Sequence, residues 1–326
     1  MPRSRVTLKD VAAASGVSAT TASFVLNRVT GQTIPPATQE RVRRAAAELG
    51  YVPHGSARAL REGSSRLVLL NVGELPVAGS LRSFIAGLDA ELAAHEHTLL
   101  VRHGRTGDAT LRRAVETADP RAVIDLVKVY AADDPDRLDG GWIDGLATHT
   151  ATQIDYLAGR GHTRIGFAMP SDDRLARIAR LRLQQARTVA RTRGLPAPAE
   201  FTLDDFVAAA GTITAVATFD GHAQARVVPP VAVPDGHAAV TAVAAFDDDT
   251  ALRLLSAMAD RGLHAPDDLA VIGFDDTGHG GFWRPALTTV RIDAEGYGRR
   301  AARAVLGLPT DAAPPAPSTV IVRSTA

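Results

Sequence analysis

Residues 7–27 read TLKDVAAASGVSATTASFVLN, and this stretch decides the fold of the N-terminal part of the chain. Thr7 and Ser18 each stand where a hydroxyl can cap the start of a helix, and Asp10 follows Thr7 at the spacing of a capping box. Gly16 can adopt the positive φ that ends a helix. The stretch therefore predicts two short helices joined by a tight turn.

The apolar residues of these two helices fall on faces that can pack together. They are Leu8, Val11 and Ala12 in the first helix and Ala22, Val25 and Leu26 in the second. That packing turns the small and polar residues of the second helix outward, where they can approach phosphates and base edges closely. A second helix presented in this way is the reading element of a helix-turn-helix, so the sequence predicts DNA binding.

The charge of the chain is unevenly placed. Residues 1–66 carry ten Lys and Arg against four Asp and Glu, whereas the remaining 260 residues carry 26 against 32, and the total is zero. A basic end on an acidic body suits contact between that end and a polyanion. Chance unevenness is the alternative, but the basic part coincides with the helix-turn-helix.

Composition excludes several classes of function. At 326 residues the chain can hold about two domains, and it contains no cysteine, which excludes disulfides and thiolate metal sites. No apolar run is long enough to span a bilayer or to act as a secretory signal, so we expect a cytoplasmic protein with no membrane partner. Phosphate-binding and nucleophile motifs are absent, so we expect no enzyme, no cofactor and no metal.

Residues 36–49 predict a third helix, whose inward residues are Val42, Ala45, Ala46 and Leu49. Residues 55–61 have the length of one or two helical turns, and a helix this short is marginal in water unless DNA or a second copy of the chain holds it. We therefore expect a DNA-binding domain over residues 1–52, a hinge over residues 53–65 and a larger domain over residues 66–326.

The larger domain alternates apolar runs with helical patterns. The runs expected to be strands are 67–72, 98–101, 122–129, 164–168, 241–246, 269–274 and 319–322, and the expected helices are 80–95, 150–160, 175–193, 250–261 and 293–306. This alternation predicts an α/β fold with parallel sheets covered on both faces. We expect two lobes, one formed by about 66–161 with 293–310 and the other by 162–292 with 311–326.

Residues 6–27, 41–53 (RVRRAAAELGYVP) and 56–60 (SARAL) together resemble the lac repressor family of bacterial transcription regulators, and the resemblance spans nearly the whole chain. It implies an all-α helix-turn-helix domain followed by a two-lobed sensor domain similar to periplasmic binding proteins. It also implies a homodimeric repressor that binds near-palindromic double-stranded operator DNA and responds to a small-molecule effector, a sugar or a related metabolite.

The resemblance implies roles for particular residues in DNA binding. The residues expected to read bases are Ala19, Thr20 and Phe24, and those expected to hold phosphates are Thr7, Thr21, Ser23 and Asn27. Ala57 and Leu60 are expected to contact DNA from the hinge, with Leu60 as a wedge in the minor groove. Two alternatives remain: Phe24 either presses on a thymine methyl or folds back into the core, and Leu60 could be an ordinary core leucine.

For the effector, the resemblance points to Arg182 in ARLRL (179–183) and Asp275 in VIGFDD (271–276), which offer a charged donor and a charged acceptor. Asp247 stands where the family usually has an amide, and Trp283 could stack on a sugar ring. The alternatives without an effector role are a surface arginine for Arg182, a strand-end cap for Asp275 and loop packing for Trp283. Because Asp247 replaces the usual amide and residues 128–147 look shortened, an effector-independent repressor is a second hypothesis. A small-molecule-binding or catalytic α/β protein that does not regulate DNA is a third.

Overall fold

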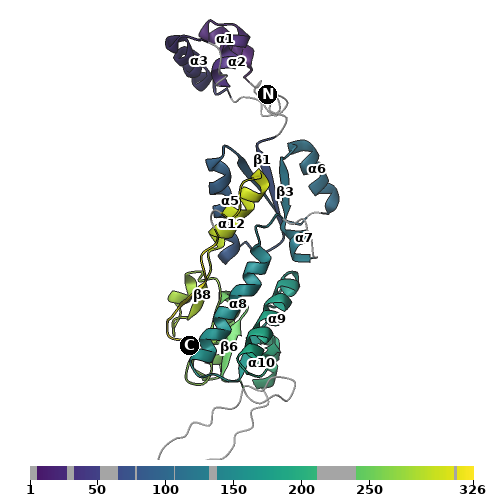
Figure 1. Cartoon of the computed structure of the whole chain (residues 1–326), viewed down its shortest axis with the longest axis vertical. Helices are drawn as coiled ribbons and strands as arrows, with labels where there is room; N and C mark the ends of the chain where they lie inside the picture. Colours follow the sequence, from purple (N-terminus) through teal and green to yellow (C-terminus); the bar gives the residue numbers. More distant parts are fainter. Residues whose placement is uncertain are drawn as a thin grey trace, which may run out of the picture. The chain divides into compact units, whose positions relative to one another are not determined.

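The computed structural model describes residues 6–27, 33–51, 65–77, 79–105, 107–131, 138–210, 240–311 and 314–326. The chain divides into two compact units, Met1–Arg66 and Leu67–Ala326 (Figure 1). The hinge helix expected at residues 55–61, with Ala57 and Leu60, lies outside the described residues. Within the described ranges, no helix combines the length and apolarity that crossing a membrane requires.

The N-terminal unit is a three-helix bundle of α1 (Leu8–Ser15), α2 (Ala19–Leu26) and α3 (Pro36–Leu49). The predicted capping box is present: Thr7 N donates to Asp10 Oδ2 at 2.7 Å, and Asp10 N donates to Thr7 Oγ1 at 3.4 Å. These caps satisfy backbone groups that a short helix cannot pair by itself. Ser18 caps α2 in the same way, since Thr21 N donates to Ser18 Oγ at 3.0 Å, so both helices begin where the sequence predicted.

The core of this unit is small and aliphatic, formed by Val11, Ala12, Ala22, Val25, Val42, Ala45 and Ala46. The prediction that Leu49 points inward is wrong, because this side chain is 38% exposed. Tyr51 packs against this core from just beyond α3. Arg41 ties α3 to the end of α1, because its Nε donates to the carbonyl of Ser15 at 2.9 Å.

The C-terminal unit begins with a parallel sheet of order β2-β1-β3, formed by β1 (Leu67–Gly73), β2 (Thr98–His103) and β3 (Ala122–Asp125). Figure 1 shows α5 (Gly79–Ala94) and α12 (Ala294–Leu306) on one side of this sheet and α6 (Asp108–Ala118) on the other. The expected strand at 122–129 is too long. Leu126, Val129 and Tyr130 are buried at helical spacing, so the chain continues as α7 (Leu126–Ala131).

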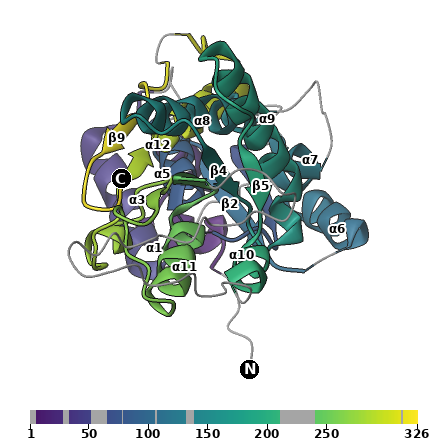
Figure 2. The same ribbon diagram turned by 90° about the horizontal axis from the view of Figure 1, so that it is seen from below.

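A second parallel sheet has the order β5-β4-β6-β7. Its strands are β4 (Ile165–Ala168), β5 (Ala199–Phe201), β6 (Ala242–Ala245) and β7 (Ala270–Ile272). Its helices are α8 (Trp142–Gly159), α9 (Ala176–Thr192), α10 (Leu203–Ala210) and α11 (Asp248–Ala259), with 3-10 turns at Asp173–Leu175 and His279–Gly281. Seen from below, α8 and α9 lie on one side of β4 and β5, and α10 and α11 on the other (Figure 2).

Alternate residues of the second sheet enter two different cores, as the pleat requires. Phe167 and Ala244 belong to the core under α8 and α9, whereas Ala168 and Val243 belong to the core under α11. Helix α8 begins at Trp142 and not at residue 150 as expected, because Trp142 itself is buried at the junction of the elements. The core under α8 also extends to the first sheet.

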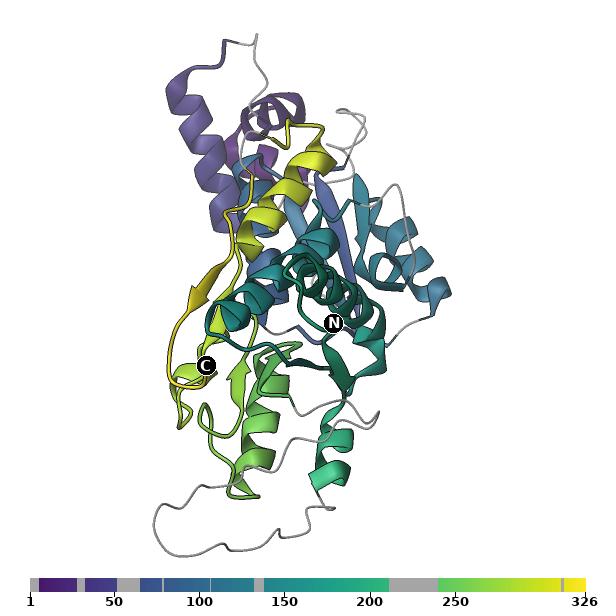
Figure 3. The ribbon, with the colours of Figure 1, turned by 60° about the horizontal axis from the view of Figure 1, so that its bottom comes forward.

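The chain closes with an antiparallel pair, β8 (Thr289–Arg291) with β9 (Thr319–Ile321), in which Val290 lies opposite Val320. Figure 3 shows this pair, in yellow-green and yellow, running between α12 and the C-terminus. The sequence predicted the last strand but not its partner β8, which is only three residues long.

Helices α5 and α12 pack with their backbones in contact, and two glycines permit this. A Cβ at Gly298 would lie 2.1 Å from the carbonyl oxygen of Phe84, and a Cβ at Gly87 would lie 2.1 Å from that of Glu295. We expect Gly298→Ala to lower the free energy of unfolding by about 1–3 kcal/mol, since the helices must separate. Gly159→Ala is the control: its Cβ would meet nothing within 4 Å and should stabilise α8 slightly.

Chemical denaturation of the full chain, followed by tryptophan fluorescence, measures both variants. Equal stability of Gly298→Ala and the wild type would contradict the close packing of α5 on α12.

Candidate functional site

The outward face of α2 carries the residues predicted to touch DNA. Ala19 and Thr20 are exposed, and Thr21, Ser23, Phe24 and Asn27 are half-buried. Phe24 is not among the side chains that form or pack against the described core of this unit. Phe24 is half-buried on α2, and its contact with DNA stays a prediction.

The polar side chains of this face are held by local hydrogen bonds. Thr21 Oγ1 and Ser18 Oγ are 2.8 Å apart, and Asn27 Nδ2 donates to the carbonyl of Ser23 at 2.8 Å. Thr7 Oγ1 donates to Asp10 Oδ2 at 2.8 Å, and hydrogen bonds from the backbone and hydroxyl of Thr7 lower the pKa of Asp10. These side chains are thus positioned before any partner arrives.

A second candidate site is a cavity of about 620 Å³ in the C-terminal unit. It lies where segments following β1, β4, β6 and β7 converge, and the carboxyl ends of parallel strands are where open α/β sheets bind ligands. Its polar lining consists of Ser80, Tyr130, Ser171, Asp172, Asp173, Arg182, Asp247, Asp249, Thr250, Arg253, Asp275 and Thr277. The volume lies in the range of small-molecule sites.

The structure brings together three of the four residues predicted to bind an effector. Arg182, Asp247 and Asp275 line the cavity although they come from α9, the start of α11 and the end of β7. Trp283 does not line it and is 37% exposed in a loop. Asp247 has a structural task as well, because its carboxylate accepts the backbone N–H of Thr250 at 2.7 Å and caps α11.

Arg182 is buried, which a surface arginine would not be. Its Nε donates to Thr150 Oγ1 at 2.8 Å, one Nη donates to Gln153 Oε1 at 2.8 Å, and the other donates to the carbonyl of Phe246. Its guanidinium carbon lies 3.6 Å from the centre of the Phe274 ring, a cation–π contact. Burial lowers the pKa of Arg182 to about 10, so it stays charged at neutral pH.

Gln153 extends this network to the sheet. Its Nε2 donates to the carbonyls of Ala245 at 2.9 Å and Gly273 at 3.0 Å, at the ends of β6 and β7. Sequence reasoning missed Gln153 and Thr150. A signal was available: both are polar residues on the buried face of α8, three positions apart, and buried polar groups need partners.

Asp275 has the most unusual environment in the cavity. Its φ is +100°, a conformation that residues other than glycine rarely adopt. Its Oδ1 is buried without a hydrogen-bond partner among the described residues. Burial, together with the nearby Asp247, raises the pKa of Asp275 to about 7 against the opposing charge of Arg182.

The loop that carries Asp275 is anchored from the neighbouring helix. Asp248 accepts the backbone N–H of Thr277 at 2.8 Å through Oδ2 and the hydroxyl of Thr289 through Oδ1. Asp276 forms ion pairs with Arg291 and Arg323. Strained backbone that is held by several such contacts is characteristic of functional sites.

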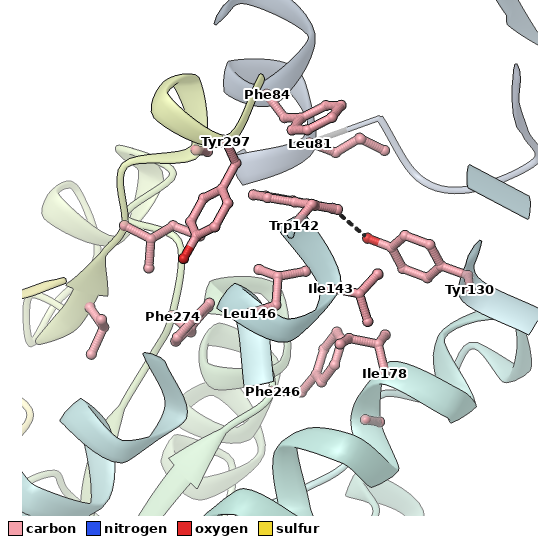
Figure 4. Close-up of a cluster of buried hydrophobic side chains, with 14 of the residues drawn as sticks. Leu81, Phe84, Tyr130, Trp142, Ile143, Leu146, Ile178, Phe246, Phe274 and Tyr297 are labelled. Atoms are coloured by element: carbon pink, nitrogen blue, oxygen red, sulfur yellow. Dashed lines mark hydrogen bonds between the residues drawn. The ribbon is translucent and has the colours of Figure 1, made fainter. Parts of the chain in front are cut away.

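Aromatic residues form one wall of the cavity and connect it to the rest of the unit. Trp142 Nε1 donates to the hydroxyl of Tyr130 at 3.1 Å, and both residues line the cavity. The rings of Phe84 and Tyr297 lie 5.1 Å and 5.9 Å from the Trp142 ring (Figure 4). Helices α5, α7, α8 and α12 therefore meet at Trp142.

Both units match families of known proteins. Residues 7–54 match the family described as bacterial regulatory proteins, lacI family, and residues 154–325 match the periplasmic binding protein-like domain. The HTH-type transcriptional repressor PurR of Vibrio campbellii is 26% identical to this chain, over 90% of this chain's length and 89% of the length of PurR. The HTH-type transcriptional regulator CelR of Thermobifida fusca is 28% identical over 92% and 91%.

The lac repressor dimer bound to operator and the anti-inducer ONPF has the same fold, with a TM-score of 0.70 at 22% identity over 99% of both chains. A helix-turn-helix unit and a periplasmic-binding-like unit in one chain define a class of bacterial transcription regulators. The chain belongs to the lacI family of bacterial regulatory proteins. It is a DNA-binding transcriptional regulator, as the helix-turn-helix predicted.

Proposed function

We propose that this regulator is a homodimeric cytoplasmic repressor whose affinity for a near-palindromic operator is controlled by a small molecule in the 620 Å³ cavity. The observation that carries the proposal is Asp275, an acceptor with one unsatisfied oxygen at the wall of a cavity of ligand size. Buried polar atoms are normally satisfied, so an orphan at a cavity wall points to a ligand that supplies the missing donor.

For DNA, we propose the division of contacts that the sequence suggested. Ala19, Thr20 and Phe24 meet base edges, and Thr7, Thr21, Ser23 and Asn27 meet phosphates. The candidates within α2 lie outside its buried residues Ala22 and Val25, Asn27 caps the C-terminal end of α2 and Thr7 caps the start of α1, which supports contact with DNA from these positions. Ala57 and Leu60 complete the contacts from the hinge, where an apolar wedge unstacks a base step in return for a larger contact surface.

For the effector, we propose contacts to Arg182, Asp247 and Asp275. PurR and CelR are named as regulators, and a CelR–cellobiose complex shares this fold with a TM-score of 0.50, which supports a small polar effector here. A ligand that binds one arrangement of the two sheets better than another shifts the population between them. It can shift operator affinity only by the ratio of its affinities for the two states.

The test selects bound fragments from random DNA with the full-length protein and footprints the enriched sequence. We expect a near-palindrome bound about 10³–10⁷ times tighter than random DNA. Leu60→Ala should weaken that binding, whereas Leu49→Ala, an exposed leucine of α3 outside the proposed contacts, should not. Weak, steeply salt-dependent binding with no enriched sequence would refute specific operator recognition and leave only the charge asymmetry.

A further inference from the structure

The charged side chains that line the effector cavity are mostly carboxyl groups. Its described lining contains five aspartates and two arginines. One of the aspartates, Asp172, is neutralised by Arg174, whose Nε lies 2.8 Å from Oδ1. Asp173, Asp247, Asp249 and Asp275 remain as carboxyl groups facing only two guanidinium groups.

Some donors of the lining are engaged inside the protein. Arg182 uses three of the five N–H groups of its guanidinium for Thr150, Gln153 and Phe246. The hydroxyl of Thr277 donates to Asp248 at 3.2 Å. Arg253, in α11, is charged but exposed.

An anionic ligand would therefore meet repulsion from the carboxyl groups, and the charged donor that it would find deep in the cavity is Arg182, with the two N–H groups left over from its three hydrogen bonds. A ligand with an ammonium group would instead satisfy Asp275 Oδ1, the buried oxygen that has no partner among the described residues. Charge-assisted hydrogen bonds of this kind are stronger than neutral ones. Hydroxyl groups on the same ligand can donate to Asp247, which lines the cavity beside it.

Building on the function proposed above, we propose that the effector is a cationic amine that bears neighbouring hydroxyl groups, with its ammonium on Asp275 and a hydroxyl on Asp247. The apolar part of the lining, which includes Leu81, Leu146 and Trp142, packs against the carbon skeleton of the ligand. The class includes amino sugars and open-chain amino alcohols.

Two sets of matched probes test the charge preference by isothermal titration of the full-length protein at constant ionic strength. One set is glucosamine, glucose and glucose 6-phosphate, and the other is 2-amino-1,3-propanediol, glycerol and glycerol 3-phosphate. In at least one set we expect the amine to bind at least tenfold tighter than the neutral molecule, and the phosphate not to bind. Asp275→Asn should abolish the preference for the amine, whereas Asp260→Asn, an exposed carboxylate at the end of α11, should keep it.

The proposal is overturned if a neutral or phosphorylated probe binds as tightly as its amine partner, or if neither amine binds. These outcomes are separable from failure of the regulator itself. If a phosphorylated probe changes operator affinity, the proposal of an effector-controlled repressor stands and the proposal of an amine effector is refuted. If an amine binds without changing operator affinity, the inference about the cavity stands and effector control of DNA binding is refuted.

Discussion

Replacing Arg182 by alanine is expected to lower the free energy of unfolding by about 3–5 kcal/mol, the cost typical of breaking a buried charged network. The change leaves the side chains of Thr150 and Gln153 and the carbonyl of Phe246 without their donor in a buried region. Each unsatisfied buried group costs about 1–3 kcal/mol. The substitution of Arg182 also removes a cation from the face of the Phe274 ring and opens a void between α8, α9 and the second sheet.

Urea denaturation of the full chain measures this loss. Arg180→Ala is the matched control, because Arg180 lies on the same helix with its side chain exposed and should change stability by less than about 0.5 kcal/mol. Arg182→Lys keeps the charge but not the planar fork, so we expect an intermediate loss. Equal effects of Arg182→Ala and Arg180→Ala would show that the buried network contributes nothing to stability.

The second large effect is a gain of stability from Asp275→Asn. Because burial raises the pKa of Asp275 to about 7 in the folded protein, from 3.8 in the unfolded chain, the folded state binds more protons between these values. The stability of the wild type therefore falls as pH rises from about 4 to about 7. At 1.36 kcal/mol for each unit, removing the charge gains up to about 4 kcal/mol at pH 8 and little at pH 4.

Asparagine is the informative substitution because it tolerates positive φ at least as well as aspartate and lacks the titrating group. Denaturation at pH 5 and pH 8 should show a gain that grows with pH. The neighbouring Asp276→Asn should have the opposite sign: burial raises the pKa of Asp276, but hydrogen bonds from Arg323 and Arg291 lower it below its usual value. A gain at Asp275 that does not change between pH 5 and pH 8 would contradict a buried titrating carboxyl.

A stabilising change at Asp275 would also indicate why the protein retains the aspartate. Strain and an unsatisfied charge at a ligand site are tolerated when they serve binding, and removing them trades activity for stability. We expect the same variant to lose its response to effector. Stability and binding would then depend on one carboxyl in opposite directions.

The short elements at the N-terminus were predictable because their signals are local. The limits of the first two helices are set by hydrogen bonds and backbone conformations within a few residues, at Thr7, Asp10, Gly16 and Ser18. The third helix runs over Pro36–Leu49, as its pattern indicated. The alternation of apolar runs and helices likewise indicated parallel sheets. Neither signal requires knowledge of what lies across the fold.

The sequence by itself thus determined the class of the protein, its helix-turn-helix and the candidate roles of Arg182, Asp247 and Asp275. Only the tertiary structure decided that these three share a cavity, that Trp283 does not line it, and that Arg182 is held by Thr150 and Gln153. It also decided that the run at 122–129 turns into a helix after Asp125. These features depend on contacts between residues far apart in the chain, which burial and packing select and which no local pattern records.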